Sequence, residues 1–251
     1  MLNFANVKIR KVLTKSDIKR INSLKRKSKR KENGLFVVEG VKIVRELIDS
    51  DFNIQQIFAL KSELENFPDA VSVSEKDLER ITHLSSANKV LALVEIPEMT
   101  KVDSTKETIL VIDGVNDPGN LGTIIRTADW FGITKIVCSE NSVDCFNSKV
   151  IMSTMGSIFR INISYENLPT YLAETNLPIY GALLEGESIY KTEFSSPSII
   201  LMGSESHGIS QELIPLITNP VTIPGAGNTE SLNLGVSTAI FCSEYFKQQL
   251  K

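Results

Sequence analysis

The chain has 251 residues, enough for one large domain or two smaller ones that each bury a hydrophobic core. Hydrophobic residues make up 42% and charged residues 23%, which are ordinary values for a globular protein. No run reaches the roughly eighteen apolar residues of a membrane span, and residues 1–11 (MLNFANVKIRK) lack the apolar core and cleavage site of a signal peptide, so we expect a soluble, cytoplasmic protein without a membrane partner.

Cysteine and histidine are sparse and scattered. Cys138, Cys145 and Cys242 show no CxxC spacing, which suits a reducing compartment and predicts neither a disulfide framework nor a zinc site. His83 and His207 have no other candidate ligands near them in sequence, so we expect no metal.

The net charge of −3 conceals a strong asymmetry. Residues 1–35 contain twelve Lys and Arg against Asp17 and Glu32, a local charge of +10, whereas the rest of the chain carries −13. Clustered cations release counterions when they bind a polyanion, so this segment predicts nucleic acid as a partner. The alternative is a solvated, partly helical leader, and the close packing of cations in residues 25–31 favours the polyanion.

The first part of the chain predicts an arm followed by a small domain. Residues 1–33 have a weak helical pattern and then the basic cluster, and we expect a basic N-terminal arm that is flexible in part. Residues 34–96 predict a small α/β domain, and polar, unpatterned residues 97–106 (PEMTKVDSTK) predict a linker. The expected elements are strands at 35–39, 54–60, 71–73 and 90–96, a helix at 41–48, and helices beginning at 61 and 75.

Residues 107–251 predict a second α/β domain. Strands alternate with helices along it, which favours a parallel sheet with helices on both faces. The expected strands are 109–112, 135–138, 158–163, 179–184, 199–202 and 221–223, and the expected helices begin at 120, 148, 168 and 233.

The best-defined stretch runs from residue 109 to 133 (ILVIDGVNDPGNLGTIIRTADWFGI). An apolar strand is followed by a loop of Gly, Pro, Asp and Asn and then by a helix with one apolar stripe. At 100° per residue, Asn120 and Arg126 fall away from that stripe, toward the mouth of the loop. This stretch alone favours the alternative that Arg126 is an ordinary solvated helix arginine.

Polar, glycine-containing loops follow three of the expected strands. These loops are DGVNDPGN after residue 112, GSESHG after 202 and PGAGNTESLNLG after 223. Ligands of open parallel sheets collect at the carboxyl ends of strands, so we expect one composite site. Neither GxGxxG nor a Walker GxxxxGK is present, which counts against a nucleotide-dependent α/β enzyme.

Three segments carry a resemblance to a known family. DGVNDPGNLGTIIRTADWFG, LMGSESHGIS and IPGAGNTESLNLGVSTAIFCSE look like the three motifs of the SpoU/TrmH family of RNA 2′-O-ribose methyltransferases in the SPOUT superfamily, in the same order and spacing over about residues 108–246. The segment KVIMSTMGSIFRI resembles the stretch between the first two motifs. GLFVVEGVKIVRELI resembles the small substrate-binding domain that many members carry.

The resemblance implies a catalytic domain with a C-terminal trefoil knot, assembled as a homodimer. Knots are very rare, and none follows from periodicity. The implied cofactor is S-adenosyl-L-methionine, held in the knot by backbone atoms. By motif position, the implied cofactor contacts are Gly203, Ile223, Leu232 and, less directly, Leu184.

The resemblance also implies which residues act in catalysis and RNA placement, namely Asn120, Arg126, Glu205, Ser231 and Asn233. The implied reaction is attack of a ribose 2′-hydroxyl on the sulfonium methyl. A guanidinium is fully protonated in proteins, so our hypothesis is that Arg126 binds the target phosphate and lowers the pKa of the hydroxyl, with Glu205 orienting it. A helix-capping role is the alternative for Asn120 and Asn233, and a turn role for Glu205. His207 receives no role.

Two departures from the family are visible: Gly235 stands where many members have serine, and GSES stands for a GNEG-like loop. The main hypothesis is an S-adenosylmethionine-dependent RNA ribose methyltransferase acting on rRNA or tRNA, with rRNA favoured. The alternative is a non-catalytic RNA-binding protein on the same scaffold. The sequence contains no code for the target nucleotide, since RNA is often recognised by shape and by splayed single strands.

Overall fold

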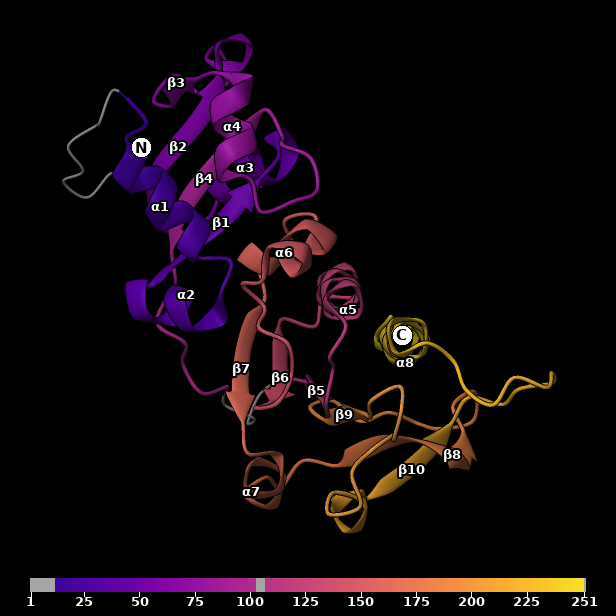
Figure 1. Cartoon of the computed structure of the whole chain (residues 1–251). Coiled ribbons are helices and arrows are strands. Elements are labelled where there is room, and N and C mark those ends of the chain that lie inside the picture. Colours follow the sequence, from indigo (N-terminus) through magenta and orange to yellow (C-terminus); the bar gives the residue numbers. More distant parts are fainter. Residues whose placement is uncertain (1–11, 103–106, 251) are drawn as a thin grey trace. The chain divides into compact units, whose positions relative to one another are not determined.

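The computed structural model describes residues 12–102 and 107–250. Residues 1–11, where part of the expected arm falls, and part of the expected linker lie outside the described residues. The chain divides into two compact units, whose elements are labelled in Figure 1. Unit 1 takes the chain through Glu98 together with Asp144–Phe159, and unit 2 takes Met99–Val143 together with the chain from Arg160 onward.

Unit 1 is built on a mixed four-stranded sheet in the order β1-β4-β2-β3. β4 is antiparallel to both β1 and β2, and β3 is parallel to β2. Every residue of β1 is buried, because helices and loops cover both its faces. The strands are β1 (Leu35–Glu39), β2 (Ile54–Leu60), β3 (Val71–Val73) and β4 (Val90–Glu95), and the helices are α1 (Lys15–Ser23), α2 (Lys27–Asn33), α3 (Val41–Ile48), η1 (Lys61–Glu63), α4 (Glu75–Ile81), α6 (Ser148–Thr154) and η2 (Ser157–Phe159).

The basic N-terminal segment is part of this unit from residue 15 onward. α1 and α2 are capped helices: Thr14 and Asp17 form a capping box at the start of α1, and Gly34 ends α2 with a φ of 63°. Ile21 and Leu24 are fully buried in the core of unit 1. The expectation of a flexible arm is therefore wrong for residues 15–33, because its apolar side chains are needed to complete the core.

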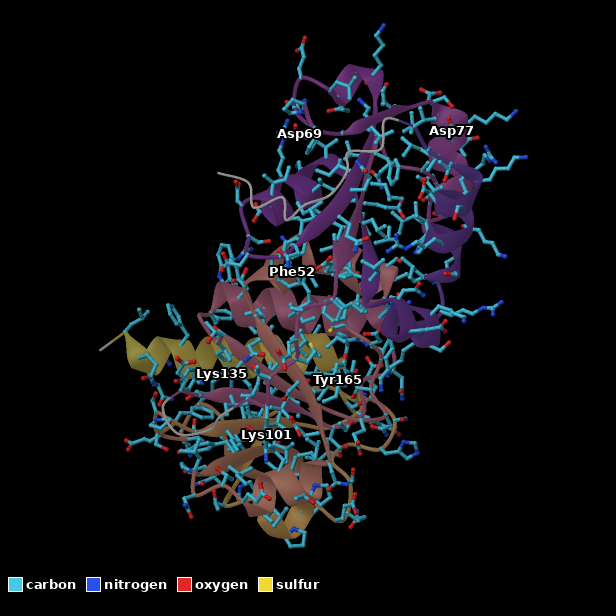
Figure 2. The ribbon with its side chains drawn as sticks, turned by 90° about the vertical axis from the view of Figure 1, so that its left-hand side faces the viewer. Phe52, Asp69, Asp77, Lys101, Lys135 and Tyr165 are labelled. Atoms are coloured by element: carbon cyan, nitrogen blue, oxygen red, sulfur yellow. The ribbon has the colours of Figure 1, made fainter. Side chains whose placement is uncertain are left out.

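Residues 144–159 pack on unit 1, although they follow β6 in the chain. The buried guanidinium of Arg30 pairs with Asp144 at 2.5 Å and also donates to the Leu24 carbonyl. The Phe36 and Phe146 rings lie 4.6 Å apart, and Phe159 meets Phe52 edge to face. Phe52 is labelled in Figure 2, as is Asp77, which completes a capping box with Ser74 at the start of α4.

Unit 2 is built on a six-stranded sheet in the order β10-β8-β9-β5-β6-β7, and every neighbouring pair is parallel. This confirms the predicted parallel α/β sheet. The trefoil knot stays a prediction. The strands are β5 (Ile109–Ile112), β6 (Lys135–Ser139), β7 (Asn162–Glu166), β8 (Ile179–Ser188), β9 (Ile199–Met202) and β10 (Asn219–Thr222), and the helices are α5 (Pro118–Trp130), α7 (Leu168–Ala173), η3 (Ile214–Leu216) and α8 (Leu234–Gln249).

Helices cover the two faces of this sheet. α5 and α8 lie side by side on one face, and α7 lies on the other (Figure 1). On the α7 face, apolar residues of β5, β9 and β6 pack against α7 and the turn before η3, with Val111, Leu201, Tyr171 and Leu213 among the buried members. On its own face, α5 buries Leu121, Ile124, Ile125 and Ala128.

Several element boundaries differ from the sequence expectation, and two of them, at α5 and β7, have a clear local cause. α5 begins at Pro118 rather than Asn120, because Asp117 caps the helix and Pro118 occupies its first turn. β7 covers Asn162–Glu166 rather than residues 158–163. Ile158 and Phe159 belong to a 3₁₀ turn, and their burial in unit 1 produces the apolar pattern that resembles a strand. The hydroxyl of Tyr165 in β7, labelled in Figure 2, donates to the carbonyl of Val143 at 2.7 Å.

None of the helices within residues 12–102 and 107–250 has the length and apolar character needed to cross a membrane.

Candidate functional site

The candidate site lies where the order of the strands in the unit 2 sheet reverses. From β5 the chain moves to β6 and β7 on one side, whereas β9, β8 and β10 occupy the other side. β5 and β9 are neighbours in parallel register, so Ile112 and Met202 end at the same edge. A change of strand order at a carboxyl edge is where open α/β sheets bind ligands. The loops after these two strands therefore emerge together.

Three side chains from the three predicted loops are joined by hydrogen bonds. Glu205 Oε1 accepts from Asn120 Nδ2 at 2.6 Å and from Asn233 Nδ2 at 2.6 Å. Asn233 Nδ2 also donates to Asn120 Oδ1 at 3.1 Å. We call Asn120, Glu205 and Asn233 the polar trio. The predicted convergence of the loops is thus present in the structure, at an exposed position.

The helix starts hold the two asparagines in place. The Asn120 backbone N–H donates to Asp117 Oδ1 at 2.9 Å, so the cap of α5 is Asp117 and the capping alternative for Asn120 is wrong. Asn233 does cap α8, since its Oδ1 accepts from the backbone N–H groups of Gly235 and Val236. The two polar atoms of its side-chain amide have separate roles: Oδ1 caps the helix, and Nδ2 donates to Glu205.

Arg126 and Ser231 do not join the polar trio. Both side chains are exposed, and neither makes a hydrogen bond or ion pair to any residue that the structure describes. Arg126 lies six residues after Asn120 on α5, about 9 Å along the helix axis. We expected Glu205 to orient Arg126, but its carboxylate is bound by the two asparagine amides. Arg126 is therefore an exposed cation of α5 that makes no contact with the polar trio among the hydrogen bonds and ion pairs of the described residues.

Gly203 occupies a position that excludes every side chain. A Cβ there would lie 2.1 Å from the Gly208 carbonyl carbon and 2.2 Å from the Ile209 nitrogen. The close approach lets Ser204 and Gly208 pair through two backbone hydrogen bonds of 2.9 Å, which closes a tight hairpin at residues 204–208. Glu205 sits in the turn of this hairpin.

The other expected cofactor contacts are apolar side chains near the strand ends. Leu184 is 80% exposed and Leu232 is 46% exposed, while Ile223 is half-buried. The hydroxyl of Thr222 at the end of β10 donates to the Leu184 carbonyl at 3.0 Å, so Leu184 and Ile223 lie close together on adjacent strands. Large exposed apolar side chains beside polar loop groups match the lining of a small-molecule site.

Sequence reasoning missed two polar residues at the same edge. Asp113 follows β5 and is buried, and its Oδ2 accepts from the backbone N–H and the hydroxyl of Ser210. Both lie within the motif segments, and the position of Asp113 directly after a buried strand was the available signal. In the described residues, no group of three or more His, Cys, Asp or Glu side chains is arranged to hold a metal ion. Burial raises the pKa of the Cys138 and Cys242 thiols to about 12, so neither is a nucleophile at neutral pH.

Comparison with known families and structures covers both units. Residues 107–243 match the model of the SpoU rRNA methylase family, and residues 15–92 match that of an MRM3-like substrate-binding domain. The chain is 31% identical over 232 residues to the 23S rRNA (guanosine(2553)-2′-O)-methyltransferase RlmP of Bacillus subtilis, covering 89% of this chain and 93% of the relative.

Solved structures agree over nearly the whole chain. A TrmH-family protein from Porphyromonas gingivalis superposes with a TM-score of 0.85 at 34% identity, covering 93% of this chain and 98% of the other. An AdoMet-bound rRNA methyltransferase from Sinorhizobium meliloti superposes with a TM-score of 0.86 at 29% identity, covering 98% of this chain and 100% of the other.

Proposed function

This chain belongs to the SpoU rRNA methylase family, and we propose that it transfers a methyl group from S-adenosylmethionine to a ribose 2′-hydroxyl of ribosomal RNA. The observation that carries this proposal is the polar trio, in which one residue from each motif meets at the carboxyl edge of β5 and β9. The AdoMet-bound structural neighbour and the rRNA methyltransferase relative support the cofactor and the substrate class.

The loops suit S-adenosylmethionine in their chemistry. The exposed Leu184 and Leu232 side chains offer an apolar surface to the adenine ring, and the turns around Gly203 and Ile223 offer backbone N–H and C=O groups. When bound, the cofactor supplies a methyl group on a sulfonium, which reacts by in-line displacement. The chain's own contribution is positioning, since reacting atoms must be held in line.

We assign the proton-accepting role to Glu205. Its Oε1 is occupied by two asparagine amides, whereas Oε2 makes no hydrogen bond in the described part of the chain and faces no cation. A 2′-hydroxyl that donates to Oε2 is oriented for attack and loses its proton to that oxygen as the O–CH₃ bond forms. We propose that Arg126 binds the phosphate next to the target ribose, since its exposed guanidinium makes no ion pair with any described residue.

We further propose that the substrate-binding domain extends beyond the predicted residues 34–96 to include α1 and α2, and that residues 107–251 form the methyltransferase domain, with the linker at 97–106 between them. The match of residues 15–92 to a substrate-binding domain supports the first assignment. Exposed cations in α2 and in the turn between α1 and α2, such as Lys25, Arg26 and Lys31, give this domain an RNA-attracting surface. An enzyme of rRNA with this composition works in the cytoplasm.

A homodimer is also part of the proposal. Neighbouring helices α5 and α8 each leave a large apolar side chain in solvent, with Trp130 82% exposed and Val236 50% exposed. Exposed tryptophan is rare on monomer surfaces and common in interfaces. Light scattering of the wild-type chain and of Trp130→Glu tests this, and a monomeric wild type contradicts it.

The function is tested by methyl transfer to unmodified 23S rRNA made by transcription. With tritium-labelled S-adenosylmethionine, the wild-type chain is expected to label the RNA, and the labelled position is expected to resist alkaline cleavage, which requires a free 2′-hydroxyl. Calorimetry with S-adenosylmethionine tests the alternative function. A chain that binds RNA but shows no binding of the cofactor is a non-catalytic RNA-binding protein.

A further inference from the structure

Asp113 connects the two loops that meet at the site. Its backbone N–H donates to the Met202 carbonyl at 2.9 Å, which extends the pairing of β5 with β9 by one residue. Its side chain is only 8% exposed, and Oδ2 accepts from Ser210 N at 2.8 Å and from the Ser210 hydroxyl. A single carboxylate oxygen therefore accepts both hydrogen bonds that Ser210 donates, although the two residues are 97 positions apart in the chain.

Ser210 stands at the base of the hairpin that carries Glu205. The hairpin is closed by the Ser204 and Gly208 backbone bonds, and Ile209, which links it to Ser210, is 4% exposed. Gly203 on the other side of the hairpin passes close to its far strand, since a Cβ added there would lie 2.1 Å from the Gly208 carbonyl carbon and 2.2 Å from the Ile209 nitrogen. The position of the turn thus depends on where Ser210 is held.

We propose that Asp113 is a positioning residue for the methyl transfer, acting through Ser210 to fix the Glu205 hairpin against the first loop. The inference rests on the proposed function. Glu205 is itself exposed, so its alignment relies on the hairpin backbone and on the two asparagine amides. A charge-assisted pair of hydrogen bonds at the base of the hairpin supplies the missing restraint.

The same two strands contain a matched control at their other end. Thr108 precedes β5 and Ser198 precedes β9; Ser198 N donates to Thr108 Oγ1 at 3.1 Å, and the two hydroxyls lie 3.3 Å apart. Both residues are buried. As at Asp113 and Ser210, one side chain accepts from a serine backbone N–H and lies beside the serine hydroxyl. Here the acceptor is a neutral hydroxyl rather than a carboxylate, and the pair lies at the amino edge of the sheet, away from the loops. Thr108→Val removes it without touching the site.

The experiment compares Asp113→Asn, Ser210→Ala and Thr108→Val for methyl transfer to transcribed 23S rRNA. Asp113→Asn is expected to lower kcat about 10- to 100-fold with KM for RNA within twofold of wild type, because misplacement of a reacting group costs rate rather than binding. Ser210→Ala keeps the backbone bond, so a smaller loss is expected. Thr108→Val is expected to keep the wild-type kcat while lowering the unfolding temperature.

Two readouts separate positioning from a general loss of stability. Hydrogen exchange is expected to rise in residues 203–213 of Asp113→Asn, with β5 and β9 unchanged, and not to rise there in Thr108→Val. In a double-mutant cycle, Asp113→Asn is expected to have little further effect on kcat once Glu205→Gln is present, since the residue that it positions is already disabled.

A kcat of Asp113→Asn within twofold of wild type, full additivity with Glu205→Gln, or equal losses in Thr108→Val overturns the inference. If the wild-type chain methylates no ribosomal RNA, the proposed function fails instead. Unchanged exchange of residues 203–213 in a catalytically impaired Asp113→Asn also contradicts the positioning role.

Discussion

Thr123 of α5 and Gly235 of α8 meet where the two helices approach beside the site. A Cβ on Gly235 would lie 3.2 Å from Thr123 Cγ2 and 3.3 Å from Asn233 Oδ1. A side chain at residue 235 is therefore tight against the threonine methyl, which must shift by a few tenths of an ångström to admit one.

Replacing this glycine with a branched side chain is expected to destabilise unit 2. Gly235→Val forces apart α5 and α8, and overpacking of this kind costs about 1–3 kcal/mol. Urea denaturation measures the loss. Thr123→Ser, which removes only the Cγ2 methyl, is expected to recover part of it in the double variant, and strict additivity of the two changes would show that the contact is not the cause.

Glu205→Gln is expected to lower kcat about 100-fold while leaving the affinities for RNA and S-adenosylmethionine near their wild-type values. The amide oxygen of glutamine still accepts from Asn120 and Asn233, but an NH₂ group replaces Oε2 and cannot take a proton. Single-turnover methyl transfer measures the rate. The nearby exposed carboxylate of Glu212 supplies a matched control, since Glu212→Gln changes the net charge equally. Equal rates for the two variants would remove Glu205 from the chemistry.

Asn233 has two roles that substitution can separate. Asn233→Ser keeps a helix-capping oxygen but loses the amide that donates to Glu205, so it is expected to retain stability and lose most activity. Asn233→Ala loses both, with an expected cost of about 0.5–2 kcal/mol in the free energy of unfolding. Thermal unfolding and methyl transfer are measured on the same samples. An active Asn233→Ser variant would reduce this residue to a cap.

The basic helices are expected to set the salt dependence of RNA binding. Deleting residues 1–33 is an unsuitable test, because Ile21 and Leu24 belong to the unit 1 core and Arg30 is buried against Asp144. Replacing the exposed Lys25, Arg26 and Lys31 with alanine is expected to reduce the slope of log K against log salt by about 2, at about 0.7 for each phosphate contact.

A charge-matched control is available on the same unit. Lys42, Lys61 and Lys76 are exposed and lie outside α1 and α2. The triple alanine variant at these lysines removes the same charge and is expected to leave the salt slope closer to wild type. Calorimetry with S-adenosylmethionine is expected to give one affinity for both variants. Equal slopes for the two triple variants would show that the cations around α1 and α2 contribute no more to RNA binding than other exposed cations of unit 1.

His83 is expected to make unit 1 less stable as the pH falls. Burial lowers its pKa from 6.5 to about 4. Its Nε2–H donates to the Ile21 carbonyl at 2.8 Å, so Nδ1 of the neutral ring accepts from the Ser148 hydroxyl at 3.0 Å. The unfolded chain binds a proton at His83 more readily than the folded chain, so the free energy of unfolding falls as the pH drops from about 6.5 toward 4, by at most about 3 kcal/mol.

Nearby charges enter the same measurement. Burial raises the pKa of Glu39, whose carboxylate accepts from the His83 backbone and from Thr82, so protonation of Glu39 favours the folded state and opposes the effect near its own pKa. Lys25 and Arg30 lower the His83 pKa further. Urea denaturation of wild type and His83→Gln between pH 4 and 7 tests the assignment. The variant is expected to show the flatter profile, and parallel profiles would exclude His83.

The sequence by itself determined the local elements and the position of the motif loops. β1, β2, β3, β5 and β9 have the bounds that their apolar runs predict, because each is short, buried and bounded by turn-forming residues. The order of strands and helices likewise predicted the parallel sheet of unit 2, since parallel strands need helical crossovers. The convergence of Asn120, Glu205 and Asn233 followed from motif resemblance and the rule for strand ends.

Only the tertiary structure decided which groups touch. That Glu205 binds two asparagine amides rather than Arg126, and that Asp113 holds Ser210, depends on atoms brought together from positions 28 to 113 residues apart, which no local pattern encodes. The packing of residues 144–159 on unit 1 and the burial of Ile21 and Leu24 have the same cause. The sequence shows that an apolar side chain must be buried or that a buried charge must be paired, but only the fold determines which residue it contacts.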